Sequence, residues 1–500
     1  MHYTLDPERV FAVRDRKIYG QFLEHFHRQI YDGIYDPQSP LSDNEGFRTD
    51  VVEALRAISV PIIRWPGGCF VSSYDWKKAV GANRTPSFDK AWRVEESNEF
   101  GTDEFIAYCH KLNCEPYICT NAGTGTEEQM SDWMEYCNLD HEGEYARMRI
   151  ANGHREPHNV RYWSIGNENY GGWEIGAKDA IAWGRKVLEA SKMLKRVCPQ
   201  AELSAAALAD PEWNLRLLTM AGERLNWISI HGYWDRLVQV DEPADYDACM
   251  AYTPAIEEPV RKVRGMLMAL GLEKRISIAY DEWNLRGWHH PNIHSVAQGL
   301  TPADYLDPRD RNDFNATYTM ADAIFTACFL NMVHRNADVV RMANFAAAVN
   351  TRGLLYTYPQ GIVKRSMYYV FELYTQYLYD EVLDFHAGET RVMTVRSKEG
   401  DNVVVAQIDC IATRSSVYDD VGIACINKHA TDSITLTIKC LAAYRILEVR
   451  VLAGENVDDY NDIDHEPIHI ERCDSIGTYS DGILKLQLPA HSVCVATLRK

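Results

Sequence analysis

The sequence lacks any segment that could hold the chain in a membrane or carry it across one. No run of about 18 apolar residues occurs, and the opening MHYTLDPERVFAV has neither the basic segment nor the apolar stretch of a signal peptide. An excess of positive charge is also missing, since 52 Lys and Arg stand against 71 Asp and Glu, a net charge of −19 over 500 residues. Such a surface repels phosphate backbones and anionic lipids. We therefore expect a cytoplasmic protein with no nucleic-acid or membrane partner.

Cysteine pairs of the kind that form a disulfide ladder or a paired CxxC zinc site are absent among the 13 cysteines. This absence predicts reduced thiols. What is present is a globular composition, 46% hydrophobic and 25% charged, which excludes disorder and provides a full core. The 12 Trp and 28 Tyr favour a neutral small molecule or glycan as partner, because aromatic faces stack on sugar rings, although aromatic residues also fill cores.

Short apolar runs alternate with helical stretches over some 370 residues. The helical stretches include Asp50–Ile58, Thr102–Leu112, Lys178–Arg196 and Ala321–Arg335, the last with one apolar face. Eight strands, each followed by a helix, indicate a (β/α)8 TIM barrel. The competing doubly wound sheet usually has fewer strands and a Gly-rich first turn, which is missing here. The strand-like runs are Ile18–Phe22, Pro61–Trp65, Pro116–Cys119, Val160–Ile165, Leu203–Ala207, Trp227–His231, Ile276–Tyr280 and Val339–Ala343.

The pattern changes towards the C-terminus. From Arg391 to Lys500 the chain consists of short β-rich runs such as VMTVRS, VVVAQID and SITLTIK, separated by turn residues. This spacing is typical of an all-β sandwich. We predict a catalytic barrel over residues 14–380 and a β-sandwich domain over 381–500, joined by an N-terminal strand within residues 1–13.

Two glutamates follow barrel strands that lie nearly opposite one another. Glu168 comes after the fourth strand and Glu282 after the seventh, and side chains at the carboxyl ends of barrel strands meet at one mouth. Hydrolysis of a glycosidic bond needs such a pair, one carboxylic acid to protonate the leaving oxygen and one carboxylate to attack or to activate water. A single glutamate in such a place is more often a salt-bridge partner or a helix cap, but two on the expected strands favour catalysis.

A set of motifs in order resembles the arabinofuranosidases of glycoside hydrolase family 51. The likeness runs from about Tyr19 to Tyr374 and extends more loosely into the β-domain. It implies a retaining enzyme on a (β/α)8 barrel with a jelly-roll-like β-domain, intracellular and usually hexameric. The segments that carry the resemblance are GQFLEHFHRQIYDGIYD, RWPGGCFVSSYDW, NEFGTDEFIAYC, YWSIGNENYGGWEIG, WISIHGYW and YDEWN.

The resemblance also implies roles for individual residues. Glu168 is similar to the general acid/base and Glu282 to the nucleophile, and a retaining mechanism places their carboxyl groups about 5–5.5 Å apart. We further expect the acid/base carboxyl to have a raised pKa, because the Trp-rich mouth and the covalent intermediate favour its neutral form. The expected substrate contacts are Asn167, Glu24 and Cys69 for the sugar hydroxyls, Tyr233 and Arg64 beside the nucleophile, Trp92 and Trp173 as aromatic walls, and Asn121 after the third strand.

Two features depart from the family pattern. Many relatives carry glutamines after the eighth strand, whereas this chain has Asn344 to Gly353 without either, so Arg352 or water is expected to take over that contact. This departure bears on which sugar is bound and not on the reaction class. The long segment Arg286 to Tyr318 is the second departure, and it is interpreted either as a lid or subsite wall, or as an oligomer contact or plain surface loop.

Other functions fit the sequence less well. A metal-dependent barrel hydrolase would use His25, His27 and His231, but histidine at the fifth strand and Asp at the eighth are missing, so these histidines are interpreted as hydrogen-bonded scaffold. A non-catalytic glycan-binding barrel conflicts with the presence of both glutamates. Within the family, β-xylosidase and endo-β-1,4-glucanase activities remain the alternatives. The sequence predicts an exo-acting α-L-arabinofuranosidase that acts on arabinan or arabinoxylan oligosaccharides, without metal or organic cofactor.

Overall fold

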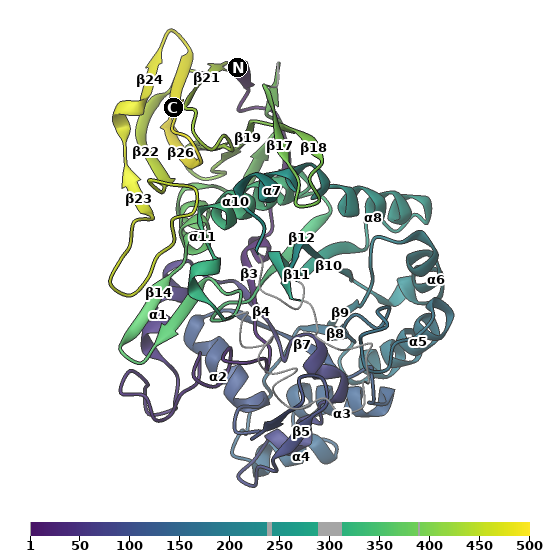
Figure 1. The fold of residues 1–500 in the computed structure, drawn as a ribbon. Helices are drawn as coiled ribbons and strands as arrows, with labels where there is room; N and C mark the ends of the chain where they lie inside the picture. The colour runs from purple at the N-terminus through teal and green to yellow at the C-terminus, as the bar shows by residue number, and fades with distance from the viewer. Residues whose placement is uncertain (1, 238–242, 289–312, 389–390) are drawn as a thin grey trace.

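The computed structural model describes residues 2–237, 243–288, 313–388 and 391–500 (Figure 1). Eight parallel strands form one sheet in the order β10-β11-β12-β3-β4-β7-β8-β9. A parallel bridge between Ala206 and Ser229 joins its two ends, where the Ala207 N–H donates to the Ser229 carbonyl at 2.9 Å. The sheet is thus a closed barrel, and the predicted (β/α)8 fold is confirmed.

The barrel strands lie on the eight apolar runs that the sequence predicted, but the sixth and seventh strands are longer than expected. They continue to Leu237 and Trp288, so Glu282 lies within a strand and not after it. A buried ion pair between Arg286 and Asp235, 2.7 Å apart, ties the extended strands together. The strands are β3 (Gly20–Phe22), β4 (Ile62–Trp65), β7 (Glu115–Thr120), β8 (Tyr162–Ile165), β9 (Glu202–Ala205), β10 (Trp227–Leu237), β11 (Ser277–Trp288) and β12 (Val340–Ala346).

Helices surround the barrel (Figure 1). Several begin at a side-chain cap: the Asp179 carboxylate accepts from two backbone N–H groups of the first turn of α5, and Thr126 forms a capping box with Gln129 at α3. In the described part of the chain, no helix combines the length and the apolarity needed to cross a bilayer. The helices are α1 (Thr49–Ala57), α2 (Thr102–Leu112), α3 (Glu127–Asn138), α4 (Glu144–Ala151), α5 (Ala180–Val197), α6 (Pro211–Ala221), α7 (Tyr246–Ala251), α8 (Glu258–Ala269), α10 (Met320–Arg335) and α11 (Ser366–Tyr377).

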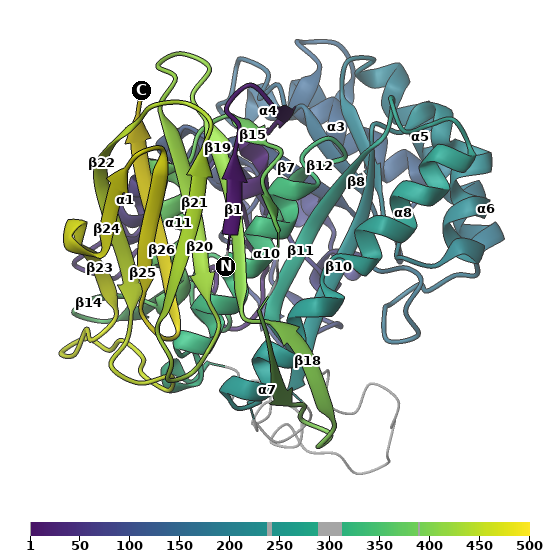
Figure 2. The same cartoon turned by 90° about the horizontal axis from the view of Figure 1, so that it is seen from above.

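The β-domain consists of two sheets packed face to face beside the barrel, and both chain ends lie on this domain (Figures 1 and 2). One sheet has the order β16-β1-β21-β25-β24 and the other β2-β15-β19-β20-β26-β22-β23. Its strands are β1 (His2–Leu5), β2 (Val10–Val13), β15 (Glu381–Leu383), β16 (His386–Ala387), β19 (Ile408–Arg414), β20 (Val421–Asn427), β21 (Ile434–Cys440), β22 (Arg445–Ala453), β23 (His469–Arg472), β24 (Gly477–Ser480), β25 (Ile483–Leu488) and β26 (Ser492–Arg499). The hairpin β17 (Val392–Arg396) and β18 (Asn402–Ala406) contacts α7.

Helix α10 differs from the one-faced helix that the sequence predicted. Every residue from Met320 to His334 is buried. The reason is that α10 contacts barrel strand β11 on one side and strands β19, β20 and β26 of the β-domain on the other. A helix packed on both sides is apolar all round. It therefore forms part of the joint between the barrel and the β-domain.

Candidate active site

Glu282, on β11, is held by two donors at the carboxyl end of the barrel. Arg64 Nη1 donates to its Oε2 at 2.8 Å, and the Tyr233 hydroxyl donates to its Oε1 at 2.6 Å. Arg64 is fully buried and Glu282 is 7% exposed. Charge-assisted bonds of this length fix the orientation of a carboxylate. Both partners were predicted to lie beside this glutamate, and the structure brings all three together.

Glu168 follows β8 in an unusual backbone conformation. Its φ is 44°, in the left-handed region that residues with a Cβ seldom adopt, and it comes two residues after Gly166 with φ 72°. This turn aims the carboxylate at two donors: Trp173 Nε1 at 2.8 Å from Oε2 and His231 Nδ1 at 2.8 Å from Oε1. Backbone outliers of this kind concentrate at functional sites.

His231 links the two glutamates, a connection that sequence reasoning missed by treating this histidine as scaffold. Its Nδ1 lies 2.8 Å from Glu168 and 3.6 Å from Glu282. Oxygen atoms of both carboxylates and the imidazole nitrogen lie within 4.8 Å of one another. The register between β10 and β11 slips after Ser229, and this bulge pairs His231 with Glu282. Nothing in the sequence pattern marks such a slip.

Asp281 contacts both His231 and Arg64, and sequence reasoning did not predict this role. It is fully buried, accepts from Tyr117 and Ser229 at 2.7 and 2.6 Å, and lies 3.4 Å from His231 Nε2. Burial acts to raise the pKa of Asp281, but the charges of Arg64 and His231 hold it below the usual value. The signal in the sequence was its position next to Glu282 in the YDEWN motif.

The protonation pattern differs from the one predicted. Burial acts to raise the pKa of Glu168, but the hydrogen bond and charge of His231 and the Trp173 N–H outweigh it and lower the pKa. Burial likewise acts to lower the pKa of His231, yet the charges of Glu282, Asp281 and Glu168 raise it to about 10. The prediction of a raised pKa at Glu168 is wrong for this structure, because the proton at neutral pH resides on His231.

Glu24 follows β3, which is separated from β11 by β12 alone, and is 3% exposed. Its Oε1 accepts from the Phe70 N–H at 3.0 Å and from Trp92 Nε1 at 2.9 Å. Burial and the charge of Glu282 raise the pKa of Glu24 to about 8. The chain passes very close here: a Cβ on Gly67, which has φ 102°, would lie 2.4 Å from the Glu24 Cβ. The glycines of the PGG motif therefore allow the second strand's loop to pack against Glu24.

Asn167 and Cys69 lie close to Arg64 and Glu168, respectively. Asn167 Oδ1 accepts from Arg64 Nη2 at 2.7 Å, and because guanidinium can only donate, this contact fixes the amide orientation. The Cys69 sulfur lies within 4.8 Å of oxygen atoms of Glu168 and of Glu174. Glu174 is a buried carboxyl of the site that was not predicted.

Arg352, in the segment after β12 where the family's glutamines are missing, lies beside Tyr233. Its guanidinium carbon lies 5.0 Å from the centre of the Tyr233 ring. The side chain is buried, and its Nε has no hydrogen-bond partner among the described residues. The charges of Tyr233 and Glu282 overcome burial and raise the pKa of Arg352. A buried guanidinium donor without a partner is suited to hold an oxygen of a bound ligand.

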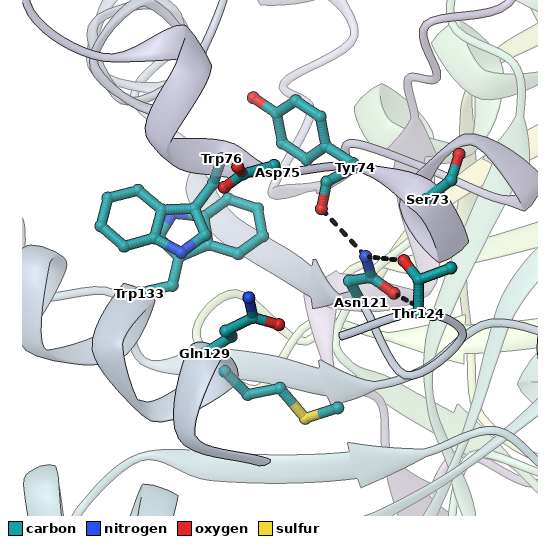
Figure 3. Close-up of a pocket in the computed structure, with 9 residues that line it drawn as sticks. Ser73, Tyr74, Asp75, Trp76, Asn121, Thr124, Gln129 and Trp133 are labelled. Carbon is teal, nitrogen blue, oxygen red and sulfur yellow. Dashed lines mark hydrogen bonds between the residues drawn. The ribbon is translucent and has the colours of Figure 1, made fainter. Parts of the chain in front are cut away.

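Asn121 is not brought together with these groups. Its Nδ2 donates to the Tyr74 carbonyl and the Thr124 hydroxyl, both at 3.0 Å, and its Oδ1 accepts from two backbone N–H groups of its own loop. It lines a pocket of about 120 Å³ with Trp76 and Gln129 (Figure 3). Since its amide is saturated there, this geometry does not support the prediction of a substrate contact. The part of segment 286–318 from 289 to 312 lies outside the described residues.

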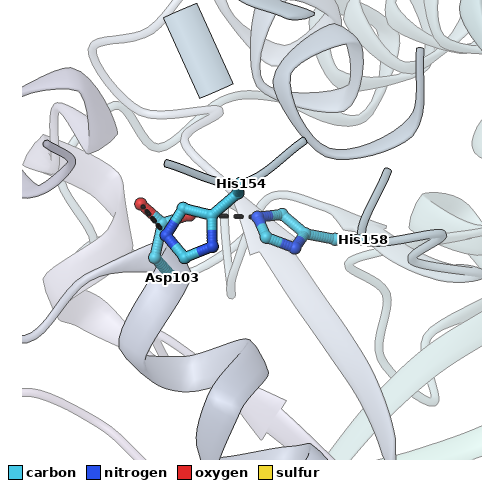
Figure 4. A group of neighbouring side chains, drawn as sticks. All are labelled: Asp103, His154 and His158. Carbon is cyan, nitrogen blue, oxygen red and sulfur yellow. Dashed lines mark hydrogen bonds and ion pairs between the residues drawn. The ribbon is translucent and has the colours of Figure 1, made fainter. Parts of the chain in front are cut away.

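Metal-ligating side chains approach one another at three places in the described ranges, two of them within the site above. In the third, Asp103 lies 3.0 Å from His158 Nε2 and 3.6 Å from His154 Nε2 (Figure 4). In this group and in the group with His231, a hydrogen bond joins a carboxylate to a histidine. The histidines proposed for a metal-dependent hydrolase are also engaged, since His25 contacts Glu96 at 3.0 Å and His27 contacts Asp313 at 3.2 Å.

Together these groups offer two carboxylates with oxygen atoms within 4.8 Å of each other, a histidine between them, and further buried polar side chains around them. Comparison with known proteins agrees with that chemistry. Models of the alpha-L-arabinofuranosidase 1 domain and the alpha-L-arabinofuranosidase C-terminal domain match residues 54–249 and 281–492.

Full-length relatives show the same similarity. The intracellular exo-α-(1→5)-L-arabinofuranosidase of Acetivibrio thermocellus is 30% identical, over 97% of this chain and 96% of its own. Among solved structures, the Thermotoga maritima α-L-arabinofuranosidase in its arabinose complex has 32% identity and a TM-score of 0.87 over 99% of both chains. The family 51 enzyme of Thermotoga petrophila has 33% identity and a TM-score of 0.88, again over 99% of both. This chain therefore belongs to the α-L-arabinofuranosidases of glycoside hydrolase family 51.

Proposed function

We propose that the protein removes terminal α-L-arabinofuranosyl groups from arabinan or arabinoxylan oligosaccharides, with retention of configuration. The observation that carries this proposal is the pair of carboxylates, Glu168 and Glu282, with oxygen atoms within 4.8 Å and His231 between them. A spacing of about 5 Å leaves no room for a water molecule between the sugar and the second carboxylate. The second carboxylate would therefore attack the sugar directly, and water would then hydrolyse the covalent intermediate.

In the first step Glu282 is the nucleophile. Arg64 and Tyr233 hold its oxygens at 2.8 and 2.6 Å, so one oxygen is oriented towards the anomeric carbon of a sugar in the cavity. As the carboxylate forms its bond to that carbon, the glycosidic bond breaks and the leaving oxygen needs a proton. The proton passes from His231 Nδ1 to the Glu168 carboxylate, 2.8 Å away, and Glu168 delivers it to the leaving oxygen.

In the second step the same pair works in reverse. Glu168, now a carboxylate beside neutral His231, accepts a proton from water as the water attacks the anomeric carbon, and Glu282 leaves. The proton returns to His231, which restores the starting charge. The high pKa of His231, about 10, keeps this proton available across neutral pH.

The remaining side chains hold the sugar. Glu24 and Cys69 are placed to bind ring hydroxyls, and Asn167 to bind the hydroxyl next to the reacting carbon. Trp92 and Trp173 each hydrogen-bond a carboxylate of the site, so they act as walls and as donors. Arg352 takes the place of the missing glutamines. No cofactor is required, because two carboxylates and a histidine provide the chemistry.

The names of two relatives support a proposed location. These two, from Acetivibrio thermocellus and Halalkalibacterium halodurans, are called intracellular exo-arabinofuranosidases. We propose that this chain also acts in the cytoplasm, on imported oligosaccharides, and that it assembles as a hexamer as the family resemblance implies.

A panel of 4-nitrophenyl glycosides tests the proposed activity. The expected result is fastest hydrolysis of the α-L-arabinofuranoside, with the β-D-xylopyranoside and β-D-glucopyranoside at least about 100-fold slower in kcat/KM. Release of arabinose alone from arabino-oligosaccharides would support exo action. Faster hydrolysis of the xyloside, or internal cleavage of a β-1,4-glucan, would overturn the assignment in favour of the alternatives within the family.

A further inference from the structure

Glu174 is a third carboxyl next to the reacting pair, in the segment between β8 and α5. It is 4% exposed. Asn167 Nδ2 donates to its Oε2 at 3.4 Å, and the Ser72 and Cys69 side chains lie beside the carboxyl and act to lower its pKa. Glu174 is therefore in contact with two of the side chains, Asn167 and Cys69, that were predicted to bind the sugar.

Glu174 is close enough to Glu168 for their charges to interact. Oxygen atoms of the two carboxyls and the Cys69 sulfur all lie within 4.8 Å. Two carboxylates at this separation in a buried site repel each other, so each favours a proton on the other, and the two titrate as a coupled pair. The contact therefore gives Glu174 an influence on the proton that Glu168 must deliver.

The groups around the pair define the sign of this influence. The pKa of Glu174 is raised to about 7. Burial and the charges of Glu168 and Glu282 raise it, while the Ser72 and Cys69 side chains act to lower it. Glu168 is faced by the cations His231 and Arg64 and by the Trp173 N–H. Cys69 is faced by three carboxyls and keeps its thiol proton, since burial and the charges of Glu174, Glu24 and Glu168 raise its pKa. Glu174 is thus largely neutral below pH 7 and charged above it.

We propose that Glu174 is a positioning residue of the acid/base group, which orients Asn167 and, through its negative charge beside Glu168, holds the catalytic proton on the Glu168–His231 pair above neutral pH. This inference rests on the proposed function. Loss of that proton would remove the His231 cation that offsets the charges of Glu168 and Glu174, whose oxygen atoms lie within 4.8 Å of each other. Glu174 therefore extends the active range towards alkaline pH.

The variant Glu174→Gln isolates the charge, because the amide oxygen can still accept from Asn167. The pH profile of kcat/KM is measured for wild type and E174Q with two α-L-arabinofuranosides, one with a good aryl leaving group and one with a poor alkyl leaving group. For the alkyl substrate, the basic limb of E174Q is expected about one pH unit below that of wild type. For the aryl substrate, which needs little protonation, the loss at pH 8 is expected to be several-fold smaller.

A second readout does not depend on turnover. A carboxyl whose pKa is raised in the folded protein destabilises it progressively as pH rises through the range from its unfolded value to the folded value, here about 4.5 to 7. E174Q lacks this loss, so its melting temperature relative to wild type should increase between pH 5 and pH 8. Asp103→Asn, which removes a buried carboxylate outside the site (Figure 4), is the matched control and should lower the melting temperature without moving the basic limb.

The outcomes are distinguishable. If wild type does not hydrolyse the furanosides, the proposed function fails and this inference fails with it. If wild type is active but E174Q has the same basic limb, or loses activity equally with both leaving groups at every pH, Glu174 is only structural and the inference alone is overturned.

Discussion

The mouth of the barrel and the interior of the β-domain are equally buried but opposite in chemistry. At the mouth Arg64, Asp281 and His231 lie side by side with less than a tenth of their surfaces or side chains exposed, whereas the β-domain interior is built from residues such as Leu436 and Leu484. Removing charges from water costs several kcal/mol per ion unless they are paired and hydrogen-bonded. We therefore infer that the buried charges at the mouth serve catalysis, whereas the apolar interior of the β-domain serves stability.

Replacing the nucleophile should give the largest effect. Glu282→Ala removes the group that forms the covalent bond, so we expect kcat to fall on the order of 10⁴-fold or more. Its fold should persist, as judged by circular dichroism and melting temperature. A rate within tenfold of wild type would exclude Glu282 as nucleophile.

Replacing the acid/base group should depend on the substrate. Glu168→Ala should lower kcat/KM by about 10³-fold for a substrate with a poor leaving group, and much less for one with a good leaving group, because only the former needs a proton. Steady-state kinetics with a series of aryl leaving groups measures this dependence. An equal loss along the whole series would contradict the assignment.

Removing the cation between the two glutamates should change the pH profile. In wild type the proton of the Glu168–His231 pair is held by His231, whose pKa is raised to about 10. In His231→Asn only Glu168 can carry it, so the basic limb of kcat/KM should move to lower pH by more than about one unit, and activity at pH 8 should fall about 100-fold. Activity at pH 5 should fall much less. An unshifted limb would return His231 to a scaffold role.

Arg352 tests the departure from the family pattern. Arg352→Gln restores the residue type that relatives carry in this segment but removes a buried cation beside Tyr233. We expect KM for the arabinofuranoside to rise about tenfold while kcat changes about threefold or less, since the contact is made equally in the ground and transition states. Arg352→Lys keeps the charge and serves as the control. A fall in kcat at constant KM would instead place Arg352 at the reacting centre.

A substitution in the β-domain should have the smallest effect on turnover. Leu436, on β21, is fully buried, so Leu436→Ala should lower the free energy of unfolding by about 3 kcal/mol. Leu441→Ala, at a residue 55% exposed in the same domain, is the matched control and should change stability little. The kcat of folded protein should be the same for both variants below their melting temperatures. A selective loss of kcat in Leu436→Ala would break the division between chemistry and stability.

Part of this arrangement could be predicted from the sequence. Glu168 and Glu282 were predictable because parallel strands deliver their carboxyl ends to one mouth, and the family motifs named Glu24, Arg64 and Tyr233. The link through His231 was not, because a register slip after Ser229 leaves no trace in apolar periodicity. The domain boundaries at residues 14–380 and 381–500 stay a prediction.

Two further differences have the same physical origin. Helix α10 was predicted with one apolar face, but its polar residues Asp322 and Asn331 are buried too, where they bind Arg286 and Asp409. The pKa of Glu168 was predicted from the Trp-rich mouth and the covalent intermediate, whereas the hydrogen bonds and charge of His231 and Trp173 lower it. Tertiary partners of this kind are not encoded locally.

The central claim is the division of labour between Glu282 and Glu168, and the configuration of one product tests it most directly. Glu168→Ala is incubated with an aryl α-L-arabinofuranoside and sodium azide, and the arabinofuranosyl azide is identified by NMR. If Glu282 forms the covalent intermediate, azide attacks that intermediate, the rate rises, and the product has the α configuration of the substrate. A β-configured azide would contradict the account, because it would mean that Glu168 is the nucleophile whose place the azide has taken.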